Sequence, residues 1–142
     1  MTTMTGQTGL AEALMRLSQL VAHVFADVSR GRDLTPQQAQ LLCTLLEGPV
    51  GMTELGRLLH LEKSSLTGLV DRVERRGLVV RTRDPSDRRA SQVALTGQGA
   101  RLATESHEDV SARVEALAGE LGPADRKRLA SAIAMMLDRV VA

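Results

Sequence analysis

Apolar residues recur at three- and four-residue steps in several separate stretches of the chain. This spacing places side chains on one face of an α-helix. The first stretch, residues 10–30, has an apolar face that ends at Gly31, a residue that commonly stops helices. The pattern predicts further helices from Pro36 to about Gly48, over 54–60, over 63–76, over 97–118, and from Pro123 to Val140.

Helix start signals support these boundaries. Thr35 is followed by Pro36 and, three residues on, by Gln38, which is the spacing of a capping box. Thr53 and Thr96 are predicted to cap the helices that follow them. In the third predicted helix, 54–60, the side chains expected to point inward are Leu55, Leu58 and Leu59.

Between residues 78 and 95 the pattern changes to the two-residue alternation of β-strands. Two strands flank a turn-forming segment, Asp84 to Arg89, which we expect to lie within a seven-residue charged loop. Residues 50–52 are long enough only for a bridging strand. A short helix, a tight turn at Leu61-Glu62, a longer polar-fronted helix and a hairpin together predict a winged helix-turn-helix.

In a helix-turn-helix, the N-terminal residues of the second helix face base edges in the major groove. The corresponding residues here are Lys63, Ser64, Ser65, Thr67 and Gly68. Candidates for phosphate contact are Thr53, Arg72 and Arg75. The alternative for the arginines at 72, 75 and 76 is a solvated helix face with Asp71 and Glu74 as local partners.

Charge is unevenly distributed along the chain. The net charge is only +1, but nine cations and five anions lie between Arg57 and Arg89, which gives this stretch +4 and the remainder −3. Such concentration suits a surface that faces phosphate. Phe25 is the only aromatic residue, so the chain has no platform for stacking unpaired bases, and duplex DNA is the favoured partner.

The terminal helices lie outside the predicted DNA-binding unit, yet each has an apolar face. A two-fold homodimer is the commonest way to bury such faces. The domain organisation predicted is a disordered segment at 1–9, a helical dimerisation region at 10–30 and 97–142, and a DNA-binding domain at 31–96. Residues 103–109 lack large apolar side chains and are expected to form a solvated bridge. The predicted dimer residues are Leu10, Leu14, Leu17, Val21, Leu117, Leu129, Ile133, Met136, Leu137 and Val140.

Other classes of protein fit less well. No run of about eighteen apolar residues predicts a membrane span, and residues 1–9 lack the basic start and apolar run of a secretory signal, so a cytoplasmic protein is expected. No glycine-rich phosphate loop or catalytic triad occurs, so we expect no enzyme and no cofactor. The three histidines lack metal-ligand spacing, and the lone Cys43 lies among leucines as a small buried residue would.

The run from Leu61 to Val79 resembles the recognition helix and wing entry of the MarR family of transcription regulators. Asp84 to Arg89, followed by Val93 to Thr96, resembles the family's wing signature. The resemblance implies a mainly α-helical fold with a small β-wing, a homodimer and a near-palindromic operator. It also implies that Arg89 enters the minor groove, held by an ion pair with Asp87, with Arg88 beside it in the wing.

The resemblance further implies release of DNA when a small phenolic or lipophilic effector binds between the DNA-binding lobe and the dimer helices. His23 is the residue that the sequence offers for such a pocket. The predicted function is therefore a sequence-specific, effector-released repressor. Two alternatives stay open: a redox-responsive regulator acting through Cys43, and a winged-helix module that binds protein and no DNA.

Overall fold

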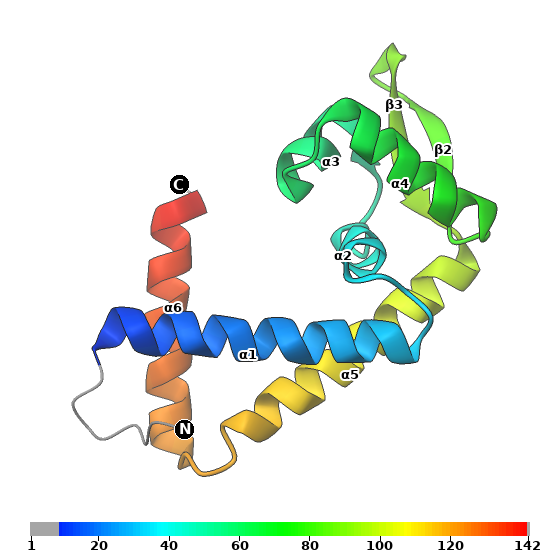
Figure 1. Cartoon of the computed structure of the whole chain (residues 1–142). Coiled ribbons are helices and arrows are strands. Elements are labelled where there is room, and N and C mark those ends of the chain that lie inside the picture. The colour runs from blue at the N-terminus through cyan, green and yellow to red at the C-terminus, as the bar shows by residue number, and fades with distance from the viewer. Residues whose placement is uncertain (1–8, 142) are drawn as a thin grey trace. The chain divides into compact units, whose positions relative to one another are not determined.

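The computed structural model describes residues 9–141, so the expected disordered segment at 1–9 lies, apart from Gly9, outside the described residues. The chain is mainly helical with one small sheet, as predicted (Figure 1). It divides into two compact units, one ending at Val110 and the other beginning at Ser111. The elements are α1 (Leu10–Gly31), α2 (Pro36–Thr44), β1 (Val50–Gly51), α3 (Met52–Leu59), α4 (Lys63–Arg75), β2 (Val79–Asp84), β3 (Asp87–Leu95), α5 (Gly97–Leu117) and α6 (Pro123–Val141).

The first unit is built around α4, whose inward face is entirely apolar. Leu66, Leu69, Val70 and Val73 are each at most 2% exposed, as their spacing predicted. They belong to one core with buried residues from α2, α3, the sheet, α5 and the segments that connect them; these are Leu34, Ala39, Leu41, Leu42, Leu45, Leu55, Leu59, Leu78, Val79, Val93 and Ala103. Burial of this face leaves the opposite side of α4 to solvent.

The sheet has three antiparallel strands in the order β1-β3-β2. Val93 of β3 pairs with Val50 on one side and with Arg81 on the other. Val79 and Val93 are buried, which fixes the base of the β2–β3 hairpin on the core. In Figure 1 the hairpin rises beside α4.

Two of the three predicted helix caps are confirmed. The Thr35 hydroxyl accepts the N–H of Gln38 at 3.1 Å, and the Gln38 side chain accepts the N–H of Thr35 at 3.2 Å, which completes the capping box. Thr96 Oγ1 accepts the N–H of Gly99 at 3.0 Å and donates to Gly77 O at 2.6 Å. The Thr53 cap is wrong: α3 begins at Met52, because β1 pairs up to Gly51 and the chain turns directly into the helix.

The inward face of α3 was predicted correctly at Leu55 and Leu59 and wrongly at Leu58, which is 42% exposed. Leu55 and Leu59 are four residues apart and share one side of this two-turn helix, whereas Leu58 lies at the edge of that side and is left partly in solvent. A Cβ on Gly56 would lie 3.1 Å from Leu61 O and 3.6 Å from a Leu66 methyl carbon. The absence of a side chain at Gly56 thus lets α3 approach the turn at Leu61 and the start of α4 closely.

The expected solvated bridge at 103–109 is wrong for one face of α5. Ala103 is fully buried and Ser106 is 3% exposed, because small side chains let the helix pack closely. Arg32, just after α1, forms ion pairs with Glu105 at 3.8 Å and with Asp109 at 3.7 Å. Only the opposite face of this segment is exposed.

The second unit contains the end of α5 and α6. Arg126 of α6 pairs with Glu115 of α5 and donates to Ala118 O at 2.7 Å, so it closes the turn between the helices. The apolar side chains of α6 are largely exposed in the single chain, with Leu137 at 59% and Met136 at 45%. No helix between residues 9 and 141 combines the length and apolar character needed to cross a membrane.

We expect Gly99→Ala to destabilise the protein by at least about 2 kcal/mol, since overpacking against rigid backbone costs this much or more. The reason is that a Cβ on Gly99 would lie 1.9 Å from Leu78 O. Urea unfolding followed by circular dichroism measures the effect. Gly97→Ala is the matched control, because its Cβ would meet only an Arg101 side-chain nitrogen at 3.8 Å. Equal stability of the two variants would show that the contact is not rigid.

Candidate nucleic-acid interface

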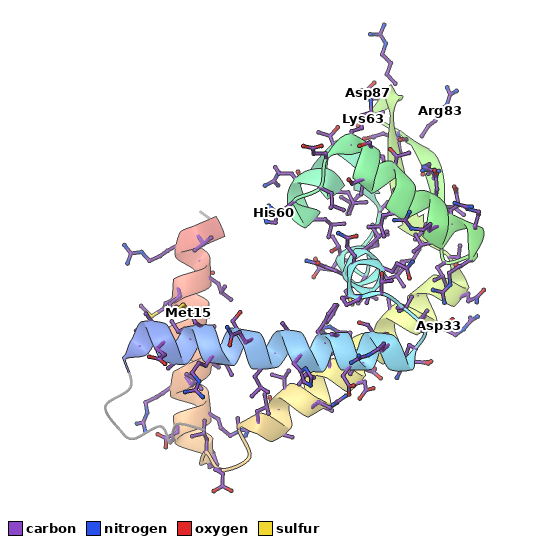
Figure 2. The ribbon with its side chains drawn as sticks, viewed as in Figure 1. Met15, Asp33, His60, Lys63, Arg83 and Asp87 are labelled. Atoms are coloured by element: carbon purple, nitrogen blue, oxygen red, sulfur yellow. The ribbon has the colours of Figure 1, made fainter. Side chains whose placement is uncertain are left out.

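The N-terminal turn of α4 presents polar groups to solvent. Lys63, Ser64, Ser65 and Thr67 are exposed, as expected for a recognition helix, and Gly68 is half-buried. Figure 2 shows Lys63 at this end of the helix. No side chain caps α4, so its first backbone N–H groups keep their donors for an outside acceptor. The positive end of the helix dipole favours a phosphate there.

The hydroxyl groups of this turn differ in what they can donate. Thr67 Oγ1 already donates to Lys63 O at 2.8 Å, within the helix. In the described part of the chain, the hydroxyls of Ser64 and Ser65 have no hydrogen-bond partner. These two serines therefore have both donor and acceptor capacity available for base edges or phosphate oxygens.

A hollow of about 960 Å³ lies between the recognition helix, α3 and the sheet. Among the predicted DNA contacts, it brings together Thr53, Lys63 and Thr67. Its remaining lining residues are Met52, Gly56, Arg57, His60, Leu61, Glu62, Leu66, Asp71, Arg81 and Ser91. The helix-turn-helix and the sheet therefore present one continuous concave face.

The wing is tighter than the sequence suggested. Only Pro85 and Ser86 form the turn, so the expected seven-residue loop is wrong. Asp84 accepts both the N–H of Ser86 at 2.9 Å and its hydroxyl at 2.7 Å, and these hydrogen bonds lower the pKa of the Asp84 carboxyl. The hydrogen bonds that Asp84 accepts therefore stabilise a tight turn, so the chain reverses direction without a long loop.

The arginines of the wing lie in an irregular part of the hairpin. Asp84 pairs with Asp87 and the next residue back, Arg83, pairs with Ser91, so residues 88–90 bulge out of the ladder. Arg89 is exposed, and the side chain of Arg88 lies outside the described part of the structure. Bulges re-aim side chains away from a regular strand. Here the bulge places the backbone of Arg89 near the tip.

Asp87 holds Arg89 by a different contact from the one expected. The two side chains form no ion pair, so that expectation is wrong. Instead, Asp87 Oδ1 accepts the backbone N–H of Arg89 at 3.0 Å. The carboxylate therefore shapes the bulge and leaves the Arg89 guanidinium exposed.

The arginines in the second half of α4 have distinct surroundings. Arg75 is exposed and its Nε donates to Asp71 O at 3.4 Å. Arg76 donates from Nη1 to Asp33 O at 2.7 Å and to the Gln38 side chain at 3.3 Å, so it ties the end of α4 to the start of α2. Arg72 points elsewhere, toward a second pocket.

The solvated-face alternative supposed that Asp71 and Glu74 pair with these helix arginines, but their carboxylates do not. Both pair with Arg81 of β2, at 2.5 Å and 2.7 Å. Sequence reasoning counted Arg81 only as part of the basic stretch. The sequence pattern that could have indicated these ion pairs is two acidic residues one helical turn apart on α4, followed by an arginine in the next strand.

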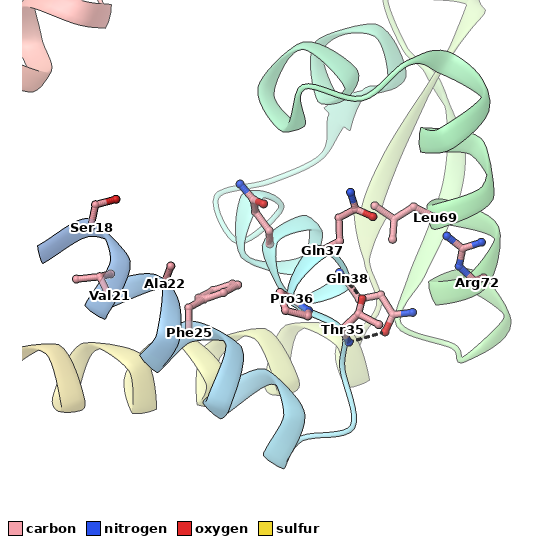
Figure 3. A pocket seen from close by; sticks show the side chains of 11 residues that line it. Ser18, Val21, Ala22, Phe25, Thr35, Pro36, Gln37, Gln38, Leu69 and Arg72 are labelled. Carbon is pink, nitrogen blue, oxygen red and sulfur yellow. Dashed lines mark hydrogen bonds between the residues drawn. The ribbon is translucent and has the colours of Figure 1, made fainter. Parts of the chain in front are cut away.

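The second pocket, of about 810 Å³, lies between α1, α2 and α4 (Figure 3). Phe25 and Val21 supply apolar surface, Arg72 supplies the only charge, and Gln37 and Gln38 supply amides. The other lining residues are Ser18, Ala22, Thr35, Pro36, Gln40 and Leu69. His23 is exposed and does not line this pocket.

Cys43 is half-buried in α2, and burial raises the pKa of its thiol. A raised pKa keeps the thiol protonated at neutral pH, which slows its reaction with oxidants. This environment disfavours the redox alternative. Among residues 9–141, no group of His, Cys, Asp and Glu side chains could hold a metal ion.

A helix-turn-helix with an exposed, uncapped second helix and an arginine-bearing hairpin defines a winged helix-turn-helix DNA-binding protein. Residues 32–90 match the model of the MarR family. The organic hydroperoxide resistance transcriptional regulator of Bacillus subtilis is 31% identical over 103 residues, which cover 72% of this chain and 69% of that protein. The transcriptional regulator FarR of Neisseria gonorrhoeae is 28% identical over 86% of this chain and 84% of its own.

Solved structures agree. NadR, crystallised with 4-hydroxyphenylacetate, superposes with a TM-score of 0.73 at 27% identity, covering 96% of this chain and 97% of its own. MarR of E. coli, at 22% identity and covering 97% and 100% of the two chains, shares the fold with a TM-score of 0.75. The chain belongs to the MarR family and is a DNA-binding transcription regulator.

Proposed function

We propose that this regulator binds a duplex operator through the N-terminal turn of α4 in the major groove and the wing in the minor groove. The observation that carries the proposal is the pair of partner-free serine hydroxyls, Ser64 and Ser65, at an uncapped helix N-terminus. Lys63 and Thr67 lie on the same exposed turn, and Thr67 shares a hollow with Thr53. Short hydroxyl side chains suit close approach to base edges and phosphates.

Arg89 is the proposed minor-groove residue. Its guanidinium is exposed, and Asp87 accepts its backbone N–H in the bulge. A narrow A·T-rich minor groove concentrates negative potential and attracts arginine. Arg88, Arg75 and the half-buried Gly68 complete the proposed contact surface, with Asp87 acting on the backbone.

We assign Arg72 a different role from the phosphate contact expected from sequence. It lines the pocket between α1, α2 and α4 and is the only cation there. Phe25 and Val21 offer apolar surface for a ring. The relative NadR was crystallised with 4-hydroxyphenylacetate, an aromatic acid of matching chemistry. We therefore propose an aromatic carboxylate effector that releases a repressor from its operator.

The exposed apolar faces at both ends of the chain support a homodimer. Leu10 is 73% exposed, Leu137 59% and Val140 83%, more than an isolated globular chain needs to leave in water. Under this proposal, residues 10–30 and 97–142 form the dimerisation region and residues 31–96 the DNA-binding domain. Two recognition helices would then meet successive major grooves of a near-palindromic site. The cytoplasm, where bacterial DNA lies, is the proposed location.

We expect Arg89→Ala to lower operator affinity by at least about tenfold and to reduce the salt dependence of log Kd by about one per protomer. The substitution removes the positive charge that is proposed to bind in the negative potential of the minor groove. Fluorescence anisotropy with a labelled duplex from the promoter beside its own gene, at several salt concentrations, measures both effects. Lys127→Ala removes the same charge from exposed α6 and should leave affinity unchanged. Unaltered binding by the Arg89 variant would refute the wing assignment.

We expect Leu137→Glu to convert a dimer to monomers at micromolar concentration, because the substitution sets two carboxylates in a face meant for apolar contact. Sedimentation velocity measures the change. Ser131→Glu, on the opposite side of the same helix, adds the same charge and should remain dimeric. A monomeric wild-type protein would overturn the proposed assembly.

We expect 4-hydroxyphenylacetate to bind the wild-type protein and Arg72→Gln to weaken that binding by about tenfold, the scale of one charge-assisted contact. Isothermal titration calorimetry measures the affinity. Arg75→Gln is the matched control, since Arg75 is exposed on the same helix and does not line the pocket. Equal affinity in the Arg72 variant and the wild type would remove Arg72 from the effector site.

A further inference from the structure

Arg81 joins the wing to the recognition helix through four hydrogen bonds. Its Nη2 lies 2.5 Å from Asp71 Oδ1, and its Nη1 lies 2.7 Å from Glu74 Oε1. Its backbone N–H donates to the second Glu74 oxygen at 3.3 Å, and Nη2 also reaches Thr67 O at 3.4 Å. We call this set of contacts, made by Arg81 with Asp71, Glu74 and Thr67, the wing clamp.

The wing clamp contains the outermost hydrogen bonds and ion pairs between β2 and α4 among the described residues. Nearer the core, Leu78 and Val79 are buried. Beyond Arg81, Thr82 and Arg83 are exposed and form no hydrogen bond or ion pair with the helix in the described part of the chain. Figure 2 shows Arg83 and Asp87 on this projecting part.

We propose that Arg81 is a positioning residue that sets the wing at a fixed distance and angle from the recognition helix, so that both reach their grooves together. The proposal rests on the assignment of Arg89 to the minor groove. Arg81 is unsuited to contact phosphate itself, because both terminal nitrogens of its guanidinium are already bonded to carboxylates. Its two acidic partners also outnumber its charge, so the clamp as a whole is not attractive to DNA.

The geometry explains why one contact matters. The end of β2 at Asp84 lies three residue steps beyond Arg81, a span of roughly 10 Å at the usual strand rise. A rotation of about 10° at the base would move the tip by roughly 2 Å over that span. The minor groove is only about 6 Å wide, so a displacement of this size takes an inserted arginine out of register.

One residue of the clamp, Thr67, also belongs to the helix turn that presents the recognition side chains. Thr67 gives its carbonyl to Arg81 while its hydroxyl bonds Lys63 O. Asp71 lies one turn further along the same side of α4. The wing is therefore held along α4, from the carbonyl of Thr67 near its N-terminal turn to Glu74 in its last turn.

A double-mutant cycle tests the proposal. Arg81→Met keeps the length and apolar stem of the side chain and removes the guanidinium. We expect it to lower operator affinity by about tenfold in the wild-type background and by less than about twofold in the Arg89→Ala background, since coupled residues are non-additive. Arg81→Lys should fall between, because one ammonium cannot bridge both acids in the same way. Equal losses in both backgrounds, or no loss in the wild type, would overturn the proposal.

Arg83→Met is the matched control for charge. Arg83 lies on the same strand, is exposed and makes no hydrogen bond or ion pair in the described part of the chain. Its substitution should have the same effect on DNA binding whether or not Arg89 is present. Coupling of Arg83 to Arg89 as strong as that of Arg81 would show that charge, and not the clamp, produces the effect.

A second measurement needs no DNA and separates this proposal from the proposed function. Backbone ¹⁵N order parameters at residues 86–89 report the motion of the wing tip. Arg81→Met should lower them, whereas Arg83→Met should not. Unchanged order parameters in the Arg81 variant would refute the positioning role even if Arg89 proves essential. If Arg81→Met lowers the order parameters but Arg89→Ala leaves operator affinity unchanged, the minor-groove assignment alone would be refuted.

Discussion

Burial of one face of α4 is the constraint on which the rest of the DNA-binding unit depends. Leu66, Leu69, Val70 and Val73 are at most 2% exposed, and together they fix the rotation of the helix about its axis. In a helix of 3.6 residues per turn, this rotation also fixes the direction in which every other side chain leaves the helix axis. Ser64, the exposed serine of the first turn, must therefore face outward. On the proposed function, the recognition surface is a consequence of the core beneath it.

The wing inherits its position from the same core. Leu78 follows shortly after the end of α4 and is buried. Its carbonyl oxygen accepts the N–H of Thr96 at 3.0 Å. That carbonyl is also the atom that Gly99 approaches too closely for any side chain. The base of the hairpin is thus held between α4 and the start of α5, and the wing clamp adds one further fixed point above it.

The charge of the basic stretch is partly used inside the protein. Arg81 pairs with two acids, Arg76 bonds the backbone of Asp33, and Arg57 pairs with Glu54 on the same helix. A count of cations along the sequence therefore overstates the charge that can meet phosphate. On the proposed function, the groups left for DNA are fewer and lie at the N-terminal turn of α4 and at the wing, which makes their placement more important than the total charge.

Local rules allowed much of this fold to be predicted. The Thr35 capping box, the Thr96 cap and the inward face of α4 depend on residues within a few positions of one another, and all are confirmed. The errors have another cause. Thr53 was wrong because strand pairing of Gly51 with β3 sets where α3 begins. The Arg81 contacts were missed because they join a strand to a helix across a turn, and spacing along the chain does not specify such pairs.

The pocket and the recognition surface are coupled by covalent and hydrogen-bonded connections within one unit. Arg72 lies on α4, one turn beyond Gly68. An anion bound in the pocket and paired with the Arg72 guanidinium would therefore pull directly on the recognition helix. Gln38, another pocket residue, both completes the α2 capping box and accepts a hydrogen bond from Arg76 at the end of α4.

A ligand shifts a conformational equilibrium only by its difference in affinity for the two states. The Gln38 side-chain oxygen already accepts hydrogen bonds from the Thr35 N–H and from Arg76 Nη1, so an effector hydroxyl that donates to this oxygen would compete with both. On the proposed function, such competition would loosen the link between α2 and the end of α4. Occupation of an otherwise unaltered pocket would leave the helix, and the affinity for the operator, as they were.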